Sequence, residues 1–181
     1  MTATAGNPST SLRISQARPE ALGALIEALE EAATWIWDRG IHQWEPGSMR
    51  AQHSALLRWA QSSQMVIATE REEVAGGCFL AEEPGPEWNG HRELAVYLHK
   101  LVVARSHSGS GVSGRLLDWC HHRALELGRP RVRLDCWDGN TRLRAFYRAA
   151  GYRELEAVPS LGYRVRLFER RLGRAPGLGT T

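Results

Sequence analysis

The sequence has few cysteines, a single lysine and no long apolar run. Its cysteines are Cys78, Cys120 and Cys136, an odd and scattered set without the CxxC or Cys/His spacing of a metal site. We interpret them as small buried side chains, with a nucleophilic Cys136 beside Asp135 as the alternative. No apolar stretch approaches the roughly 20 residues that span a bilayer, and residues 1–10 lack the features of a secretory signal. We therefore expect a cytoplasmic protein that binds no membrane and no metal ion.

Positive charge is carried almost entirely by arginine, because lysine occurs only at position 100. The net charge of +3 could indicate a nucleic-acid partner. However, acidic residues are interspersed with the arginines, and neither an arginine block nor an aromatic RNA-reading motif is present. We expect no nucleic-acid partner. A small anionic ligand explains the mild basicity equally well.

The length of 181 residues and the hydrophobic content of 43% fit one globular domain. The polar, glycine-rich ends, residues 1–10 and 173–181, are typical of flexible tails, which leaves residues 11–172 for the domain. Apolar periodicity and turn residues predict seven strands, which cover 12–16, 65–69, 75–81, 94–103, 131–137, 152–157 and 163–170. Helices are predicted at 19–40, 49–60, 111–127 and 140–150. This order predicts an α/β fold, with helices on the faces of a mixed sheet.

The strand over 94–103 alternates between two sets of side chains. Alternation predicts one face with Leu94, Val96, Leu98 and Val102, and an opposite face with Tyr97, His99, Leu101 and Val103. A histidine has a pKa near neutrality, so His99 is a candidate general base; the alternative is a half-buried histidine with a structural hydrogen bond.

A glycine- and serine-rich turn, Ser108–Ser113, joins this strand to the next helix. Backbone N–H groups converge where a helix begins, and the helix dipole also favours an anion there. Gly109 and Gly111 would let a phosphate approach the backbone closely. The turn alone could equally be an ordinary glycine-rich connection, and it matches neither GxxxxGK(S/T) nor GxGxxG.

The turn resembles the coenzyme A motif of the GNAT superfamily of N-acetyltransferases, Arg/Gln-x-x-Gly-x-Gly/Ala. Ser108 takes the Arg/Gln position, Gly111 the glycine and Ser113 the last small residue. Asn140 and the segment 145–152, AFYRAAGY, are similar to a second conserved part of that superfamily. The resemblance covers about residues 12–170 and implies a single GNAT domain, a mixed and mostly antiparallel sheet flanked by helices.

The resemblance also implies acetyl-CoA, or another acyl-CoA, as cosubstrate. The residues it assigns to the cofactor are Leu101, Val102, Val103, Ser108, Gly109, Ser110, Gly111, Val112, Ser113, Gly114, Asn140 and Tyr147. Ser108 and Ser113 depart from the motif, and Ser108 removes a side-chain contact near the pyrophosphate. Arg105, His107 and Arg115 could compensate electrostatically, or could simply be solvated.

For catalysis, the resemblance places Tyr147 where the family has the tyrosine that hydrogen-bonds or protonates the departing sulfur. Tyr97 and His99 match the positions of the family's base on the long strand. The alternative for Tyr147 is a core aromatic with a structural hydrogen bond.

The segment after the first helix often borders the acceptor site in this superfamily, which implicates Trp44 and Glu45; Asp135 could attract an amine. Packing of Trp44 on the core and a surface role for Asp135 remain alternatives. The predicted function is transfer of an acetyl group to a primary amine of a small molecule or peptide, by direct attack in a ternary complex. A non-catalytic acyl-CoA sensor or interaction module is the alternative, and a homodimer is compatible with either.

Overall fold

The structure, a computed structural model, describes residues 11–160 and 162–173. The predicted tails, 1–10 and 173–181, lie outside this range except for Gly173. Within it, no helix is long and apolar enough to cross a membrane.

The elements follow the predicted order. The strands are β1 (Arg13–Ala17), β2 (Gln64–Glu70), β3 (Glu73–Ala81), β4 (Val96–Val103), β5 (Arg131–Trp137), β6 (Arg153–Ser160) and β7 (Tyr163–Arg171). The α-helices are α1 (Leu22–Trp37), α2 (Ser48–Ala51), α3 (His53–Ser62), α4 (Val112–Glu126) and α5 (Thr141–Ala149). Short 3-10 helices are η1 (Pro19–Ala21), η2 (Pro86–Trp88) and η3 (Arg105–His107).

The helix expected over 49–60 is divided into α2 and α3 at Gln52. Glu30 of α1 explains where α2 begins, because its buried carboxylate accepts hydrogen bonds from the backbone N–H groups of Gly47 (2.8 Å) and Arg50 (2.6 Å). These two hydrogen bonds hold the start of α2 against α1.

The strands form one seven-stranded sheet in the order β1-β2-β3-β4-β5-β7-β6. Neighbours are antiparallel except β4 and β5, which are parallel. This confirms the expected mixed, mostly antiparallel sheet. Parallel neighbours need a long crossover, and α4 provides it.

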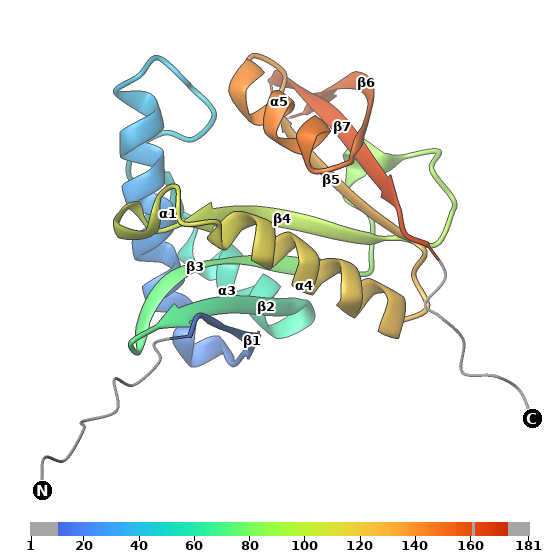
Figure 1. Cartoon of the computed structure of the whole chain (residues 1–181). Coiled ribbons are helices and arrows are strands. Elements are labelled where there is room, and N and C mark those ends of the chain that lie inside the picture. The colour runs from blue at the N-terminus through green and yellow to red at the C-terminus, as the bar shows by residue number, and fades with distance from the viewer. Residues whose placement is uncertain (1–10, 161, 174–181) are drawn as a thin grey trace, which may run out of the picture.

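Helices cover both faces of the sheet (Figure 1). On one face α4 and α5 bury a core that includes Val96, Leu98, Leu116 and Tyr147. On the opposite face α1 and α3 pack over Phe79, Val102 and the inner side of β2.

The alternation predicted for β4 is wrong beyond His99. Leu101 and Val103 pack against the same core as Val96 and Leu98, whereas Val102 belongs to the core under α1. A β-bulge is the cause: His99 pairs with Phe79 and Val102 with Gly77, so Lys100 and Leu101 both lie opposite Cys78. Lys100 has a φ of 55°, which is uncommon outside glycine.

Candidate active site

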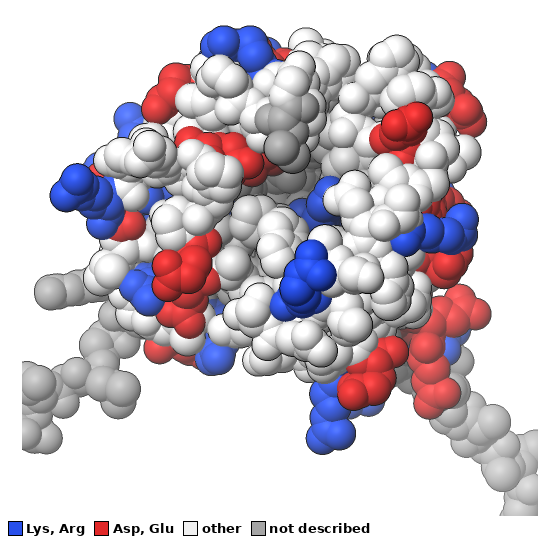
Figure 2. Space-filling view, turned by 180° about the vertical axis from the view of Figure 1, so that it is seen from behind, with Lys and Arg blue, Asp and Glu red and all other residues white. Residues whose placement is uncertain are grey.

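A cavity of about 580 Å³ lies between the diverging ends of β4 and β5. The two strands pair only over three residues each, Val96–Leu98 with Val132–Leu134, and separate beyond them. Side chains from α1, α3, α5 and β7 complete its walls. Figure 2 shows the molecule from behind, with a hollow near the middle of this face surrounded mostly by uncharged atoms.

The turn after β4 presents free backbone donors at one end of the cavity. Gly109 and Gly111 have φ values of 80° and 83°, and Gly111 is the N-cap of α4 without a capping side chain. Among the residues described, the N–H groups of Gly111, Val112 and Ser113 donate no backbone hydrogen bond. Unpaired donors at the start of a 15-residue helix fit a pyrophosphate.

Arg105 lies beside this turn and lines the cavity. Its Nη1 donates to the Ser108 hydroxyl at 3.4 Å, and its guanidinium stacks on Trp35 with 4.0 Å to the ring centroid. The other two predicted cations are occupied elsewhere: His107 pairs with Glu70 at 3.3 Å, and Arg115 donates to the Leu12 carbonyl at 3.0 Å. Arg105 is therefore the cation placed to compensate for Ser108.

Tyr147 projects into the cavity from α5. The helix begins at the predicted Asn140 cap, whose Oδ1 accepts from the Leu143 N–H at 3.0 Å, while its Nδ2 donates to Gln43 at 2.9 Å. Burial raises the pKa of Tyr147 well above its usual range, so the phenol stays protonated at neutral pH.

Ionisable groups of β4 and β5 meet in the same cavity. The His99 ring packs at a tilt of 44° against Trp59 with ring centroids 4.6 Å apart, and burial lowers the pKa of His99 to about 4. Burial, followed by the nearby charge of Glu87, raises the pKa of Asp135 to about 6, against an opposing effect of Lys100. Asp135 therefore has the pKa closer to neutrality.

Several cavity residues were not predicted from the sequence. Lys100 is half-buried, its ammonium lies 5.2 Å from the ring centroid of Trp44, and burial lowers its pKa. Glu87 follows a glycine- and proline-rich loop and accepts a hydrogen bond from the Ser160 hydroxyl at 3.1 Å. The isolated lysine in an arginine-rich chain was an available signal for Lys100; Glu87 had none.

The structure brings most predicted site residues together. Those that line the cavity are Trp44, His99, Leu101, Val102, Val103, Ser108, Ser113, Asp135, Asn140 and Tyr147. The rest of the turn, Gly109, Ser110, Gly111, Val112 and Gly114, adjoins it, with the Val112 side chain in the core.

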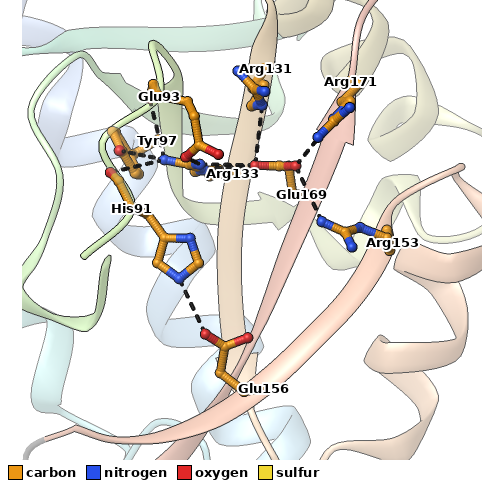
Figure 3. A network of polar contacts seen from close by, with 9 residues as sticks. All are labelled: His91, Glu93, Tyr97, Arg131, Arg133, Arg153, Glu156, Glu169 and Arg171. Carbon is orange, nitrogen blue, oxygen red and sulfur yellow. Dashed lines mark hydrogen bonds and ion pairs between the residues drawn. The ribbon is translucent and has the colours of Figure 1, made fainter. Parts of the chain in front are cut away.

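Two predicted residues lie apart from the cavity. Glu45 does not line it. Neither does Tyr97, whose hydroxyl accepts a hydrogen bond from Arg133 Nη1 at 3.2 Å in a buried network (Figure 3).

Cys136 lines the cavity as a protonated thiol, because burial raises its pKa to about 12. A thiol needs to ionise to act as a nucleophile, so this environment disfavours covalent catalysis by Cys136. In the part of the chain that the structure describes, no three His, Cys, Asp or Glu residues are grouped as metal ligands.

Comparison with known proteins decides the family. A sequence model of the Acetyltransferase (GNAT) family matches residues 29–152, more than half of the chain. The chain belongs to the GNAT acetyltransferase family. This N-acetyltransferase is also 32% identical over 152 residues to the uncharacterized N-acetyltransferase YesJ of Bacillus subtilis strain 168, covering 80% of this chain and 81% of that protein.

Solved structures show the same fold. A GNAT family acetyltransferase from Listeria monocytogenes superimposes with a TM-score of 0.70 at 20% identity, covering 94% of this chain and 99% of that one. One from Staphylococcus aureus Mu50 gives 0.68 at 16% identity, covering 90% and 100%. The predicted fold class is thus confirmed for this acetyltransferase, whose family uses acetyl-CoA as cosubstrate.

Proposed function

We propose that this GNAT acetyltransferase moves an acetyl group from acetyl-CoA to a primary amine by direct attack in a ternary complex. One observation carries the proposal: the free donors of the 108–113 turn, the Tyr147 phenol and the Asp135 carboxylate all border one cavity between β4 and β5.

Binding of the cosubstrate begins at the start of α4. The unpaired N–H groups of Gly111, Val112 and Ser113 can receive the pyrophosphate oxygens, and the helix dipole adds to their attraction. Arg105 supplies the nearby positive side chain, in place of the Arg or Gln that Ser108 replaces.

The bulged part of β4 can polarise the thioester carbonyl. Beyond Leu98 the β5-facing side of β4 has no strand partner, and the bulge at Lys100 and Leu101 interrupts pairing with β3 as well. We assign the stabilisation of negative charge on the carbonyl oxygen to backbone N–H groups of this segment, since its residues line the cavity.

An amine attacks only when neutral, so a base has to take its proton. Asp135 and His99 both border the cavity, and a base works best when its pKa lies near the working pH. The pKa of Asp135, about 6, suits this role better than that of His99, about 4.

Tyr147 is placed to assist the departing sulfur. Its raised pKa makes it a weaker acid than an ordinary thiol, for which the pKa is about 8.5, so complete proton transfer to the thiolate is unfavourable. A hydrogen bond that stabilises the thiolate is the role that fits. The protonated Cys136 favours direct transfer over an acyl-enzyme.

Two measurements test this function. Coenzyme A should raise the Tm of the protein, since ligand at about 100 times its Kd stabilises by about 2.7 kcal/mol. Acetyl-CoA with a panel of primary amines should release free thiol faster than acetyl-CoA alone. A protein that shows no shift at millimolar coenzyme A contradicts the binding step. A shift without thiol release on any amine contradicts the transfer step and favours a sensor.

A further inference from the structure

We propose that the acceptor is a free amino acid, whose carboxylate binds Lys100 and whose amine binds Asp135. The inference rests on the acetyl-transfer function above and adds the chemical class of its acceptor.

Lys100 and Asp135 carry opposite charges, and neither has a polar side-chain or backbone partner among the described residues, although the Lys100 ammonium lies over the Trp44 ring. In residues 11–160 and 162–173, neither side chain makes a hydrogen bond or an ion pair. Their neighbours in the cavity are different. Glu87 is engaged by Ser160, and Arg105 by Ser108 and Trp35.

Leaving two half-buried charges without partners is unfavourable, because each loses hydration and gains no hydrogen bond in return. Several other buried or half-buried charges in the protein are paired with an opposite charge. Carboxylates contact Arg133 and Arg166 in the sheet and Arg144 in α5. A zwitterionic ligand would satisfy both free groups at once. An ammonium donates to Asp135, and a carboxylate accepts from Lys100.

The two groups also lie near each other, where β4 and β5 separate. Lys100 is at the β4 bulge, and Asp135 is on β5, beyond the last residue pair that joins these strands. Both contribute to the same cavity wall, and each influences the pKa of the other. An acceptor held between them has its amine beside the carboxylate that would take its proton.

Aromatic side chains also line this cavity. The Trp44 ring centroid lies 5.2 Å from the Lys100 ammonium, Trp59 packs against His99, and Tyr163 also lines the cavity. These rings favour an amino acid with an apolar or aromatic side chain.

The test compares acceptors that differ only in the carboxylate. Phenylalanine, phenylalaninamide and phenethylamine form one set; tyrosine with tyramine, leucine with isoamylamine, and lysine with cadaverine form matched pairs. At about pH 8, where free carboxylates are ionised, the kcat/KM for the better amino acids should exceed that of their counterparts without a carboxylate by about 10- to 100-fold, the range expected for a charged hydrogen bond.

Variants of Lys100 test whether this residue causes the preference for the carboxylate. Lys100→Met keeps the length of the side chain and should abolish the preference for the carboxylate, mainly through KM of the acceptor. Lys100→Arg keeps the charge and should retain much of the preference. The KM for acetyl-CoA should change little in either variant, which separates this role from cosubstrate binding.

Three outcomes overturn the inference while leaving acetyl transfer intact: amines that react as fast as the matched amino acids, a preference for phenylalaninamide over phenylalanine, or a carboxylate preference that survives Lys100→Met. Failure of the function itself looks different, because then no acceptor in the panel releases thiol above the background.

Discussion

Tyr147 is the residue whose role can be tested most directly, because a matched tyrosine lies close to it. Tyr147→Phe removes only the hydroxyl of this cavity-lining residue. We expect kcat to fall by about 10- to 100-fold, the effect of losing one hydrogen bond to a charged thiolate, with little change in the KM for acetyl-CoA. Steady-state thiol release measures both constants.

Tyr152→Phe is the control for that change. Tyr152 is equally buried and packs on Tyr147 with ring centroids 5.9 Å apart, but its hydroxyl lies 2.9 Å from His121 Nε2 in the core. Its loss should affect stability more than kcat. If both variants lower kcat equally, packing explains the effect and the Tyr147 hydroxyl has no special role.

The base can be identified from the dependence of kcat/KM on pH. A base acts when deprotonated, so the rate falls as pH drops through its pKa. Asp135 predicts a decline near pH 6 and His99 a decline near pH 4. We expect the decline near pH 6 in the wild type, its persistence in His99→Ala and its loss in Asp135→Asn. A wild-type profile that is flat down to about pH 5 would contradict the assignment of Asp135.

Sequence patterns identified the residues of the site that belong to motifs, and missed those that reach it through tertiary structure. Asn140 was predicted as a helix cap because capping depends on a few neighbouring residues, and the structure confirms the cap. Lys100 stands out as the single lysine of an arginine-rich chain, but nothing in the sequence around Lys100 or Glu87 predicts a place in a cavity. Their positions depend on a bulge and on a loop that crosses to β6, neither of which periodicity reveals.

At the scale of elements, β4 shows how a single irregular residue changes the site. The order and approximate bounds of the strands followed from turns and apolar periodicity, but strict alternation placed Leu101 and Val103 on the wrong face. The bulge at Lys100 reverses the alternation, so Val102, rather than its neighbours, packs under α1. Alternation assumes a regular ladder, and a bulge depends on the partner strand as much as on the strand itself.

Gly77 of β3 is a tight point between the sheet and α1. A Cβ there would lie 2.6 Å from the Val66 carbonyl oxygen and 2.8 Å from Leu25 Cδ1. Gly77→Ala should therefore destabilise the fold by about 1–3 kcal/mol, the usual cost of overpacking, and lower the Tm by about 2–4 °C per kcal/mol.

Gly23→Ala is the matched control for Gly77→Ala. Gly23 lies in α1, and a Cβ there meets no atom within 4 Å. Gly23→Ala should stabilise by up to about 1 kcal/mol, because alanine loses less backbone entropy in a helix. Thermal unfolding of both variants checks the pair; equal effects would mean that contacts around Gly77 relax without cost.

At the scale of the whole molecule, the sheet consists of two parts that meet at β4 and β5. β4 and β5 pair over only three residues each, and the two ends of this pairing have different roles. At one end the strands diverge around the cavity. Towards the other, Arg133 of β5 reaches Glu169 of β7, the Tyr97 hydroxyl on β4, and Glu93 in the segment before β4 (Figure 3). The buried network thus links the two parts of the sheet within the short stretch where β4 and β5 are paired.

Glu169 is the centre of this network. Its buried carboxylate lies 2.9 Å from Arg133, and 3.5, 3.6 and 3.7 Å from Arg131, Arg153 and Arg171, so one buried anion faces four cations, of which Arg133 is fully buried. Glu169→Gln keeps the shape and removes the charge. It leaves the fully buried Arg133 with Glu93 as its remaining carboxylate among the described residues.

Breaking a buried ion pair on one side typically costs about 3–5 kcal/mol, so Glu169→Gln should lower the Tm by roughly 6–20 °C. Glu156→Gln is the control, because Glu156 is exposed and pairs with His91 at the surface, where an ion pair contributes at most about 1 kcal/mol. Since the network stands apart from the cavity, the KM for acetyl-CoA of folded Glu169→Gln should stay near the wild-type value. A Tm shift no larger than that of the control would show that the arginines are solvated well enough to do without Glu169, and that β4 and β5 are held together by their apolar contacts.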